Sequence, residues 1–323
     1  MKNINFYLEK NKKFIVFSSF TLIFFLGIFI TSDYGVSNDE YQERYTGFVT
    51  VKYVGDIFAP QFTENLQGEK NYPELKNYLA RTYGVLFNSP LAVIEIILNI
   101  EDKKNQFLLR HYANFLIFFI GLIFFYKIIN LRFNNWKLAL VGILFLFLSP
   151  RIFANSFYNN RDILLMSFFI ISAFFNFQYL NNQNYKNAIL SGFFTALAID
   201  TRIVGVGILL ANISIVSISN LLSKNFIKKI KFLLIYILFT FIFTYILWPY
   251  LWENPFKNFL ESFAALANWF INLENLYFGT IVNAKNLPWH YIPGWISIST
   301  PIIYLFLFCV GLFAFLYNLK KIN

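Results

Sequence analysis

Cysteine and histidine are nearly absent from this chain of 323 residues. The one cysteine, Cys309, lies inside an apolar run, which excludes a disulfide framework. The two histidines, His111 and His290, are too few for a metal site built from histidine and cysteine. The chain also lacks a GxxxxGK[ST] loop, a dinucleotide-binding glycine pattern, a serine nucleophile elbow and an HExxH motif. Any chemistry must therefore use carboxylates, arginines and aromatic residues.

Charged residues are also scarce, at 14% of the chain against about a quarter in soluble domains. A helix needs about 20 apolar residues to cross a hydrocarbon core of about 30 Å. Apolar runs predict membrane segments at 14–31, 112–129, 138–150, 163–180, 188–200, 203–222, 232–252 and 296–317. The first run is too long for a signal-peptide core and lacks a cleavage site, so we expect a retained anchor. The sequence predicts an all-α polytopic membrane protein of about eight spans, with residues 1–323 forming one membrane domain.

The net charge of +10 is distributed unevenly over the predicted loops. If the N-terminus is cytoplasmic, the inner side receives 14 of the 27 basic residues and one of the 17 acidic residues, Glu9. This is the positive-inside pattern of a cell (inner) membrane protein, and it removes the reason to expect nucleic-acid binding. The long segments 32–111 and 253–295 then face outward. We expect interfacial helices within them, at 82–100 and over the stretch of helical spacing at 253–279.

Several charged residues stand at the edges of the predicted spans, where an unpaired charge is costly. Asp39 and Glu40 follow the first span and are either a solvated interfacial pair or a pair held for chemistry. Arg151 lies beyond the short segment 138–150 and could form a structural ion pair with Asp162.

The other short segment, 188–200, is followed by a second pair of opposite charges. Asp200 and Arg202 could form a structural salt bridge or belong to a polar cavity that opens outward. His290, in LPWHYIPGW, is either an interfacial packing residue or a ligand of a substrate.

These motifs, in this order, resemble the GT-C membrane glycosyltransferases, and most closely the dolichyl-phosphate-mannose–protein mannosyltransferase and aminoarabinose transferase group, family 39. The acidic pair Asp39-Glu40 opens a long outer loop, Arg110 opens the second span, and Pro150 precedes the acidic Asp162. The stretches WPYLWENPFKNFLESF and LPWHYIPGWISISTP also resemble bacterial members of the family. The resemblance covers about residues 10–317, although family members usually continue through further spans.

The resemblance implies a glycosyltransferase that moves a sugar from a polyprenyl-phosphate donor to a glycan, lipid or protein acceptor at the outer face of the membrane. Asp39 would be the base, Glu40 would support it, and Asp162 would orient the acceptor or help to hold a divalent cation. The residues expected to bind the substrate are Arg110 as first choice for the lipid phosphate, then Arg161 and Arg202, together with Arg151 and His290.

Two other functions fit a membrane protein with charges near its spans. A transporter or flippase of a lipid-linked or anionic substrate would also enclose such charges, but it commonly has repeated halves and a midplane site, and neither is evident here. An inactive assembly partner of a larger glycan complex is the third reading. Convergence of the Asp39 and Asp162 side chains on one outward-facing cavity would favour the transferase.

Overall fold

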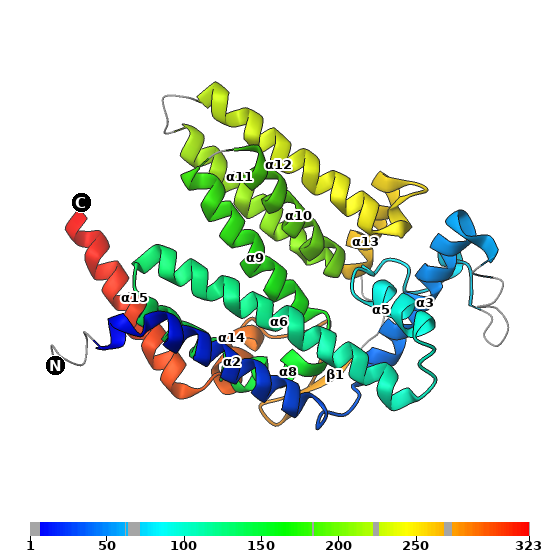
Figure 1. Ribbon diagram of the computed structural model, residues 1–323, viewed down its shortest axis with the longest axis horizontal. Coiled ribbons are helices and arrows are strands. Elements are labelled where there is room, and N and C mark those ends of the chain that lie inside the picture. The colour runs from blue at the N-terminus through cyan, green and yellow to red at the C-terminus, as the bar shows by residue number, and fades with distance from the viewer. Residues whose placement is uncertain are drawn as a thin grey trace.

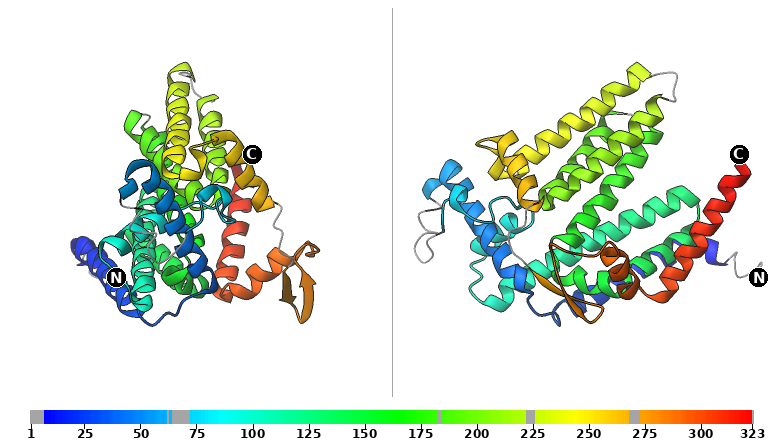
Figure 2. Two further views of the ribbon diagram at one scale, coloured as in Figure 1. Left: turned by 90° about the vertical axis from the view of Figure 1, so that its right-hand side faces the viewer. Right: turned by 180° about the vertical axis from the view of Figure 1, so that it is seen from behind.

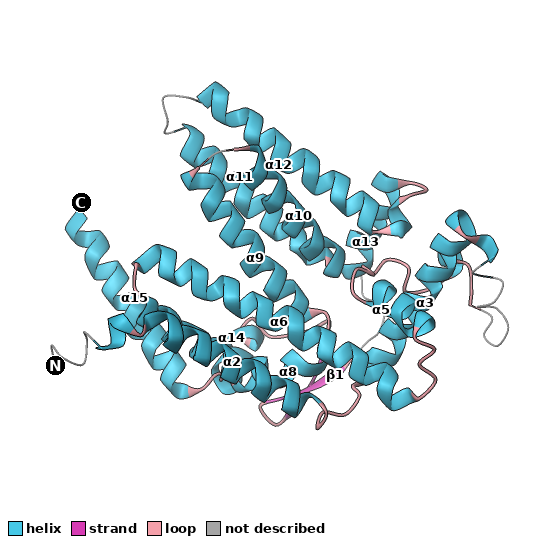
Figure 3. Cartoon of the chain, viewed as in Figure 1, coloured by secondary structure: helices cyan, strands magenta, loops and turns pink. Residues whose placement is uncertain are grey.

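The computed structural model describes residues 7–61, 63, 72–182, 184–221, 226–267 and 273–322. This part of the chain is almost entirely helical, which confirms the predicted fold class (Figures 1 and 3). The elements are α2 (Lys12–Thr31), α3 (Asn38–Phe58), η1 (Leu75–Asn77), α5 (Asn88–Ile97), α6 (Lys103–Phe133), α7 (Trp136–Phe147), α8 (Pro150–Tyr158), α9 (Asp162–Asn181), α10 (Tyr185–Thr201), η2 (Ile203–Gly205), α11 (Val206–Leu221), α12 (Phe226–Leu247), η3 (Pro249–Leu251), α13 (Pro255–Ala267), β1 (Glu274–Tyr277), β2 (Thr280–Asn283), α14 (Tyr291–Ser299) and α15 (Ile302–Ile322).

Four of the described helices are long and apolar enough to cross a membrane: α2, α6, α9 and the Ile230–Leu247 part of α12. Two bent pairs also qualify if each is one span, α7 with α8 at 69° and α14 with α15 at 117°. The structure therefore contains four to six candidate spans. Of the eight expected segments, the one at 138–150 contains most of α7, whose 12 residues rise only about 18 Å. That all eight segments cross stays a prediction.

The helices form two groups joined through α9. One group contains α9, α10, α11 and α12, and the other contains α2, α7 and α8 packed around α6 (Figure 1). Because α9 packs against both α6 and α10, it is the element that connects the groups. Helices α3, α5 and α13 lie together at the end where α6 and α9 begin, and Figure 2 shows the same arrangement from behind. Apolar side chains fill the contact of α2, α6, α7 and α8, with Phe115, Leu122 and Phe157 fully buried.

In the two long segments predicted to face outward, helices form over only part of the stretches where we expect them. Within 82–100, helix α5 spans ten residues and ends before Asn99, which adopts a left-handed φ of 48°. Within 253–279, helix α13 matches the helical spacing, but β1 replaces the helix at its far end, and residues 268–272 lie outside the described residues. Phe278 and Gly279 both have positive φ, at 46° and 82°, so they form the two-residue turn that pairs β1 with β2. The hairpin projects away from the helices (Figure 2, left).

Candidate active site

The first turn of α3 holds Glu40 in a structural position. Its Oε1 accepts a hydrogen bond of 2.7 Å from the backbone N–H of Ser37, which is the glutamate half of a capping box. Its Oε2 lies 2.7 Å from Nε2 of His111 on α6, and both side chains are 1% exposed. Glu40 therefore fixes the start of α3 against α6, and its oxygens are occupied by protein groups.

Asp39 is exposed on the same turn, beside the buried Glu43 one turn further along α3. The Glu43 carboxylate forms an ion pair with the Nε of Arg161, the residue before α9. Burial raises the pKa of Glu43, the Arg161 charge and hydrogen bond oppose this, and the charge of Asp39 adds to it. Asp39 thus acts electrostatically on a carboxylate that binds Arg161.

The charges of three candidate site residues act on the hydroxyl of Tyr83. The guanidinium carbon of Arg161 is 4.1 Å from the centre of the Tyr83 ring. Burial raises the pKa of the Tyr83 hydroxyl, the Arg161 and Arg202 charges oppose this, and the Asp39 charge adds to it. Asp39, Arg161 and Arg202 are therefore close enough to act on one hydroxyl group.

Asn159 shapes the beginning of α9 and so positions the two charged residues there. Its Oδ1 accepts hydrogen bonds from the backbone N–H groups of Arg161, at 3.2 Å, and Asp162, at 2.9 Å. Arg161 then points to α3, whereas Asp162 forms an ion pair with Arg202, which follows α10. The Arg202 and Asp162 side chains are 37% and 56% exposed, so this pair is accessible to a ligand.

Six side chains from four parts of the chain thus meet where α3, α9 and α10 come together, and we call them the junction group. Its members are Asp39, Glu43, Tyr83, Arg161, Asp162 and Arg202. Arg161 binds Glu43, one turn after Asp39, and Arg202 binds Asp162, while convergence of Asp39 and Asp162 on one outward-facing cavity stays a prediction. Neither of the two cavities identified in the described part of the chain is lined by Asp39 or Asp162.

Asp200 does not pair with Arg202, so the structural salt bridge that was one reading of this hairpin is not formed. Asp200 is fully buried, and its Oδ1 accepts a hydrogen bond of 3.2 Å from the backbone N–H of Val85. A Cβ atom on Gly84 would lie 1.2 Å from the Asp200 carbonyl oxygen. Asp200 therefore holds the backbone turn before α5 against the end of α10.

Arg110, the first choice for the lipid phosphate, lies in a separate buried network. Its Nη1 is 2.8 Å from Oε2 of Glu95 on α5, and the side chains are 1% and 4% exposed. Arg44 of α3 binds the same carboxylate through Nε at 3.1 Å. This network ties α3, α5 and α6 together, and no ion pair among the described residues joins it to the junction group. Arg110 is adjacent to His111 in the sequence, so this network lies next to the contact between His111 and Glu40.

Arg151 and His290 also lie apart from the junction group. Arg151 is exposed at the start of α8, and no ion pair with it occurs among the described residues. The alternative pair of Arg151 with Asp162 is therefore not formed. His290 is exposed beside the hairpin, where its Nδ1 lies 2.8 Å from the hydroxyl of Tyr277. This contact fits the packing interpretation of His290.

Two features of the site could have been found in the sequence but were not. Ser37-x-x-Glu40 is a capping-box pattern, which predicts a helix start and gives Glu40 a structural task. On that helix, Glu43 lies four residues after Asp39 and so on the same face. Tyr83, by contrast, has no local signal. Groups of three or more His, Cys, Asp or Glu side chains that could hold a metal ion are not found in the described ranges.

The fold and the junction group define an all-α polytopic membrane protein with carboxylates and arginines gathered at one end of its helices. Residues 90–248 match the family described as dolichyl-phosphate-mannose-protein mannosyltransferase. The match confirms the resemblance read from the motifs over this part of the chain. It includes Arg161, Asp162 and Arg202 and leaves Asp39 and Glu43 outside. No curated protein and no solved structure matches the chain.

Proposed function

We propose that the protein transfers a sugar from a polyprenyl-phosphate-linked donor to an acceptor hydroxyl at the outer face of the membrane, and that the junction group is its active site. The observation that carries the proposal is the placement of two arginines, Arg161 bound to Glu43 of α3 and Arg202 bound to the exposed Asp162. The exposed carboxylate of Asp39 lies one turn before Glu43 on α3. A base and two phosphate-binding cations are the groups that such a transfer needs.

The transfer is a single displacement at the anomeric carbon. The acceptor oxygen forms a bond to that carbon, and the bond to the phosphate oxygen breaks with its electron pair. The acceptor proton passes to the Asp39 carboxylate, and the polyprenyl phosphate leaves with the added negative charge. General-base catalysis of this kind contributes about 10²–10⁴-fold to a rate.

We assign the phosphate to Arg202 first and Arg161 second, in place of Arg110, which was the first choice from the sequence. Among the described residues, the ion-pair partner of Arg202 is an exposed carboxylate, that of Asp162, and exposed ion pairs contribute about 0–1 kcal/mol. A dianionic or monoanionic lipid phosphate can therefore compete for its guanidinium at small cost. Arg110 is 1% exposed and bound to Glu95, so we assign it to the support of α3 and α5.

The assignment of the junction group to the outer side of the membrane rests on the distribution of charged residues along α6. Glu40 contacts His111 near the start of α6, whereas the basic turn with Lys127, Arg132 and Lys137 is at the other end. The helix has 31 residues and rises about 46 Å, which is enough to separate the two sides of a membrane. If the basic turn is cytoplasmic, the junction group is at the outer side.

The test uses the purified protein in lipid nanodiscs with a panel of radiolabelled polyprenyl-phosphate hexoses and pentoses. Binding of each donor and its transfer to glycan, lipid and peptide acceptors are measured on the same samples. We expect Asp39→Asn to keep donor binding and to lose about 10²-fold or more in transfer, because the base acts in the transition state. Asp33→Asn, an exposed carboxylate before α3, is the matched control and should transfer normally.

Full transfer by Asp39→Asn would remove Asp39 from the chemistry while leaving the transferase class intact. If the unaltered protein binds none of the lipid-linked sugars, the proposed donor is wrong. If the protein instead moves a labelled lipid-linked sugar across the bilayer of proteoliposomes without transfer, the protein is a flippase.

A further inference from the structure

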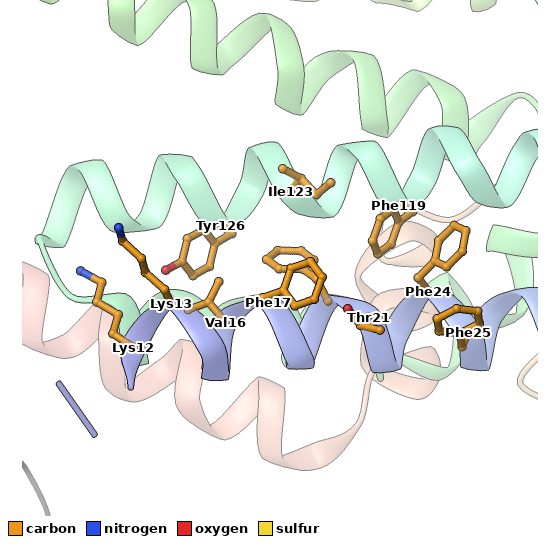
Figure 4. A pocket seen from close by; sticks show the side chains of 11 residues that line it. Lys12, Lys13, Val16, Phe17, Thr21, Phe24, Phe25, Phe119, Ile123 and Tyr126 are labelled. Carbon is orange, nitrogen blue, oxygen red and sulfur yellow. The ribbon is translucent and has the colours of Figure 1, made fainter. Parts of the chain in front are cut away.

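A groove far from the junction group runs between α2 and α6. Its volume is about 720 Å³, and its walls are mostly aromatic and aliphatic side chains of these two helices (Figure 4). The two helices meet closely at Gly27, where an added Cβ would lie 1.8 Å from the ring of Phe115. The groove occupies the length of α2 before this contact, from Lys12 to Phe25.

The floor of the groove is built from packed rings. The Phe20 ring contacts Phe119 edge-on at 5.9 Å between ring centroids and Tyr126 at 5.7 Å. Such edge-to-face contacts favour a fixed arrangement of the rings. The floor is therefore an ordered apolar surface. Only 17% of the membrane-spanning part of α2 is buried inside the protein.

Polar groups gather at one end of the groove. Figure 4 shows Lys12, Lys13 and the hydroxyl of Tyr126 at the start of α2, and the phenylalanines further along. Neither lysine forms an ion pair within the part of the chain that the structure describes. The nearby acidic residue, Glu9, instead accepts a hydrogen bond of 2.8 Å from the indole of Trp136 and lies 3.9 Å from the Nζ of Lys137. Within the described ranges, Lys12 and Lys13 thus stand at one end of an apolar groove without an ion-pair partner.

We propose that this groove binds one anionic phospholipid, with the lipid phosphate at Lys12 and Lys13 and an acyl chain along the floor of Phe20, Phe119 and Tyr126. An anionic lipid matches the groove in both charge and polarity, because its head group is negative and its chain is apolar. Basic pockets between membrane helices are sites for such head groups, and each lysine near an anionic surface strengthens binding about fivefold. This site is independent of the proposed transfer reaction.

The experiment is native mass spectrometry of delipidated, detergent-purified full-length protein titrated with phosphatidylglycerol or phosphatidylcholine. We expect one phosphatidylglycerol to remain bound under collisional activation that removes phosphatidylcholine. Lys12→Ala and Lys13→Ala should each weaken this binding about fivefold. Lys10→Ala is the matched control, since Lys10 is an exposed lysine of the same helical end that does not line the groove, and it should change binding less than about twofold.

A second pair of variants tests the apolar part of the groove without changing charge. Val16→Trp fills the groove and should abolish the retained lipid, whereas Phe14→Trp, at a side chain 72% exposed outside the groove, should not. Equal retention of the two lipids, or no effect of the lysine changes in monodisperse protein, would overturn the proposal. A dimer or a co-purified membrane helix that Val16→Trp releases would also overturn it, because a protein partner then occupies the groove.

Discussion

Arg202 forms its ion pair with Asp162, 40 residues earlier in the chain, and not with Asp200, two residues before it. The Asp200 carboxylate is buried and turned to the backbone N–H of Val85. The two carboxylates near Arg202 therefore have different tasks. One holds a backbone turn, and the other forms an ion pair with an exposed arginine whose charge acts on Tyr83.

Exchanging the charges of Asp162 and Arg202 separates structure from activity. The double variant Asp162→Arg with Arg202→Asp should stay within about 1 kcal/mol of the stability of the unaltered protein, because the pair is exposed. Its sugar transfer should fall strongly, since the cation assigned to the lipid phosphate has moved. Thermal unfolding in detergent and the transfer assay measure the two quantities. The matched exchange of Lys52 and Asp56, a 2.7 Å pair on α3, should leave both unchanged. Normal transfer by the Asp162–Arg202 exchange would contradict the assignment.

Arg110→Ala and Arg202→Ala should impair different properties. The first should lower stability, and the second should weaken donor binding. Removing Arg110 takes one of two arginines from the buried Glu95, so we expect about 3 kcal/mol lower stability with normal donor affinity per folded molecule. Removing Arg202 should weaken donor binding by about tenfold with little loss of stability, as expected for one charged hydrogen bond. Donor titrations on the monodisperse fraction, with unfolding curves beside them, distinguish the two. A donor affinity that falls more in Arg110→Ala would restore the order of preference taken from the sequence.

The Glu40–His111 contact should be structural. Glu40→Gln leaves a buried imidazole without its carboxylate, and we expect a loss of about 3 kcal/mol. The double variant with His111→Gln should be less destabilised than the sum of the single changes, since the pair is buried and direct. Glu74→Gln, which breaks an exposed pair with Lys76, is the control and should lose less than about 0.5 kcal/mol. Additive losses at Glu40 and His111 would show that the two side chains do not stabilise each other.

The raised pKa of Glu43 should make the free energy of unfolding depend on pH. Burial raises its pKa, so the folded protein binds more protons at this site than the unfolded chain. Its contribution is fully present below the ordinary glutamate pKa of about 4.3 and falls as pH rises toward the folded value. The free energy of unfolding of the unaltered protein minus that of Glu43→Gln should therefore decrease with rising pH.

Glu261 on α13 supplies a control of opposite sign for the Glu43 experiment. Burial raises its pKa, but hydrogen bonds from Tyr250 and Arg81 and the Arg81 charge outweigh burial and lower it. Its contribution is present above the ordinary pKa and is lost as pH falls through the folded value. The corresponding difference for Glu261→Gln should thus increase with pH. A flat or rising difference at Glu43 would show that its carboxylate is not desolvated as described.

Gly84 is required by the close approach of two chain segments. Gly84→Ala would place a methyl carbon 1.2 Å from the Asp200 carbonyl oxygen, so the turn before α5 or the end of α10 must move. We expect a loss of about 3 kcal/mol or more, measured by thermal unfolding in detergent. Gly207→Ala is the matched control, because its added Cβ has no atom within 4 Å, and it should be neutral or slightly stabilising. Equal stability of the two variants would exclude the close contact.

The sequence predicts those parts of the fold that depend on apolar length. Runs of about 20 apolar residues place α2, α6, α9 and most of α12, because the bilayer fixes the length of a span. The β1–β2 hairpin is missed, since its strands are only four residues each and the stretch before them has helical spacing. The turn at Phe278 and Gly279 depends on backbone conformation that apolar spacing does not report.

The candidate site is predicted only at the level of residue type. Adjacent Asp39 and Glu40 look equivalent in the sequence, but successive residues of a helix point about 100° apart, so one is exposed and the other meets His111. The partners of Arg161 and Arg202 could not be read, because opposite charges close in the sequence compete with carboxylates brought near by tertiary packing. The same competition makes Arg110 a structural residue here, since its partner Glu95 belongs to another helix.

The two ion pairs at the start of α9 also set an order for assembly during synthesis. Glu43 precedes its partner Arg161 by 118 residues, which a ribosome adds in on the order of ten seconds. During that interval the Glu43 carboxylate must be satisfied by water or by a proton, because its partner has not been made. Arg202 follows later still, after α9 and α10. The junction group is therefore complete only when both helix groups have been made, and a nascent chain released before residue 202 would carry its carboxylates without their full complement of arginines.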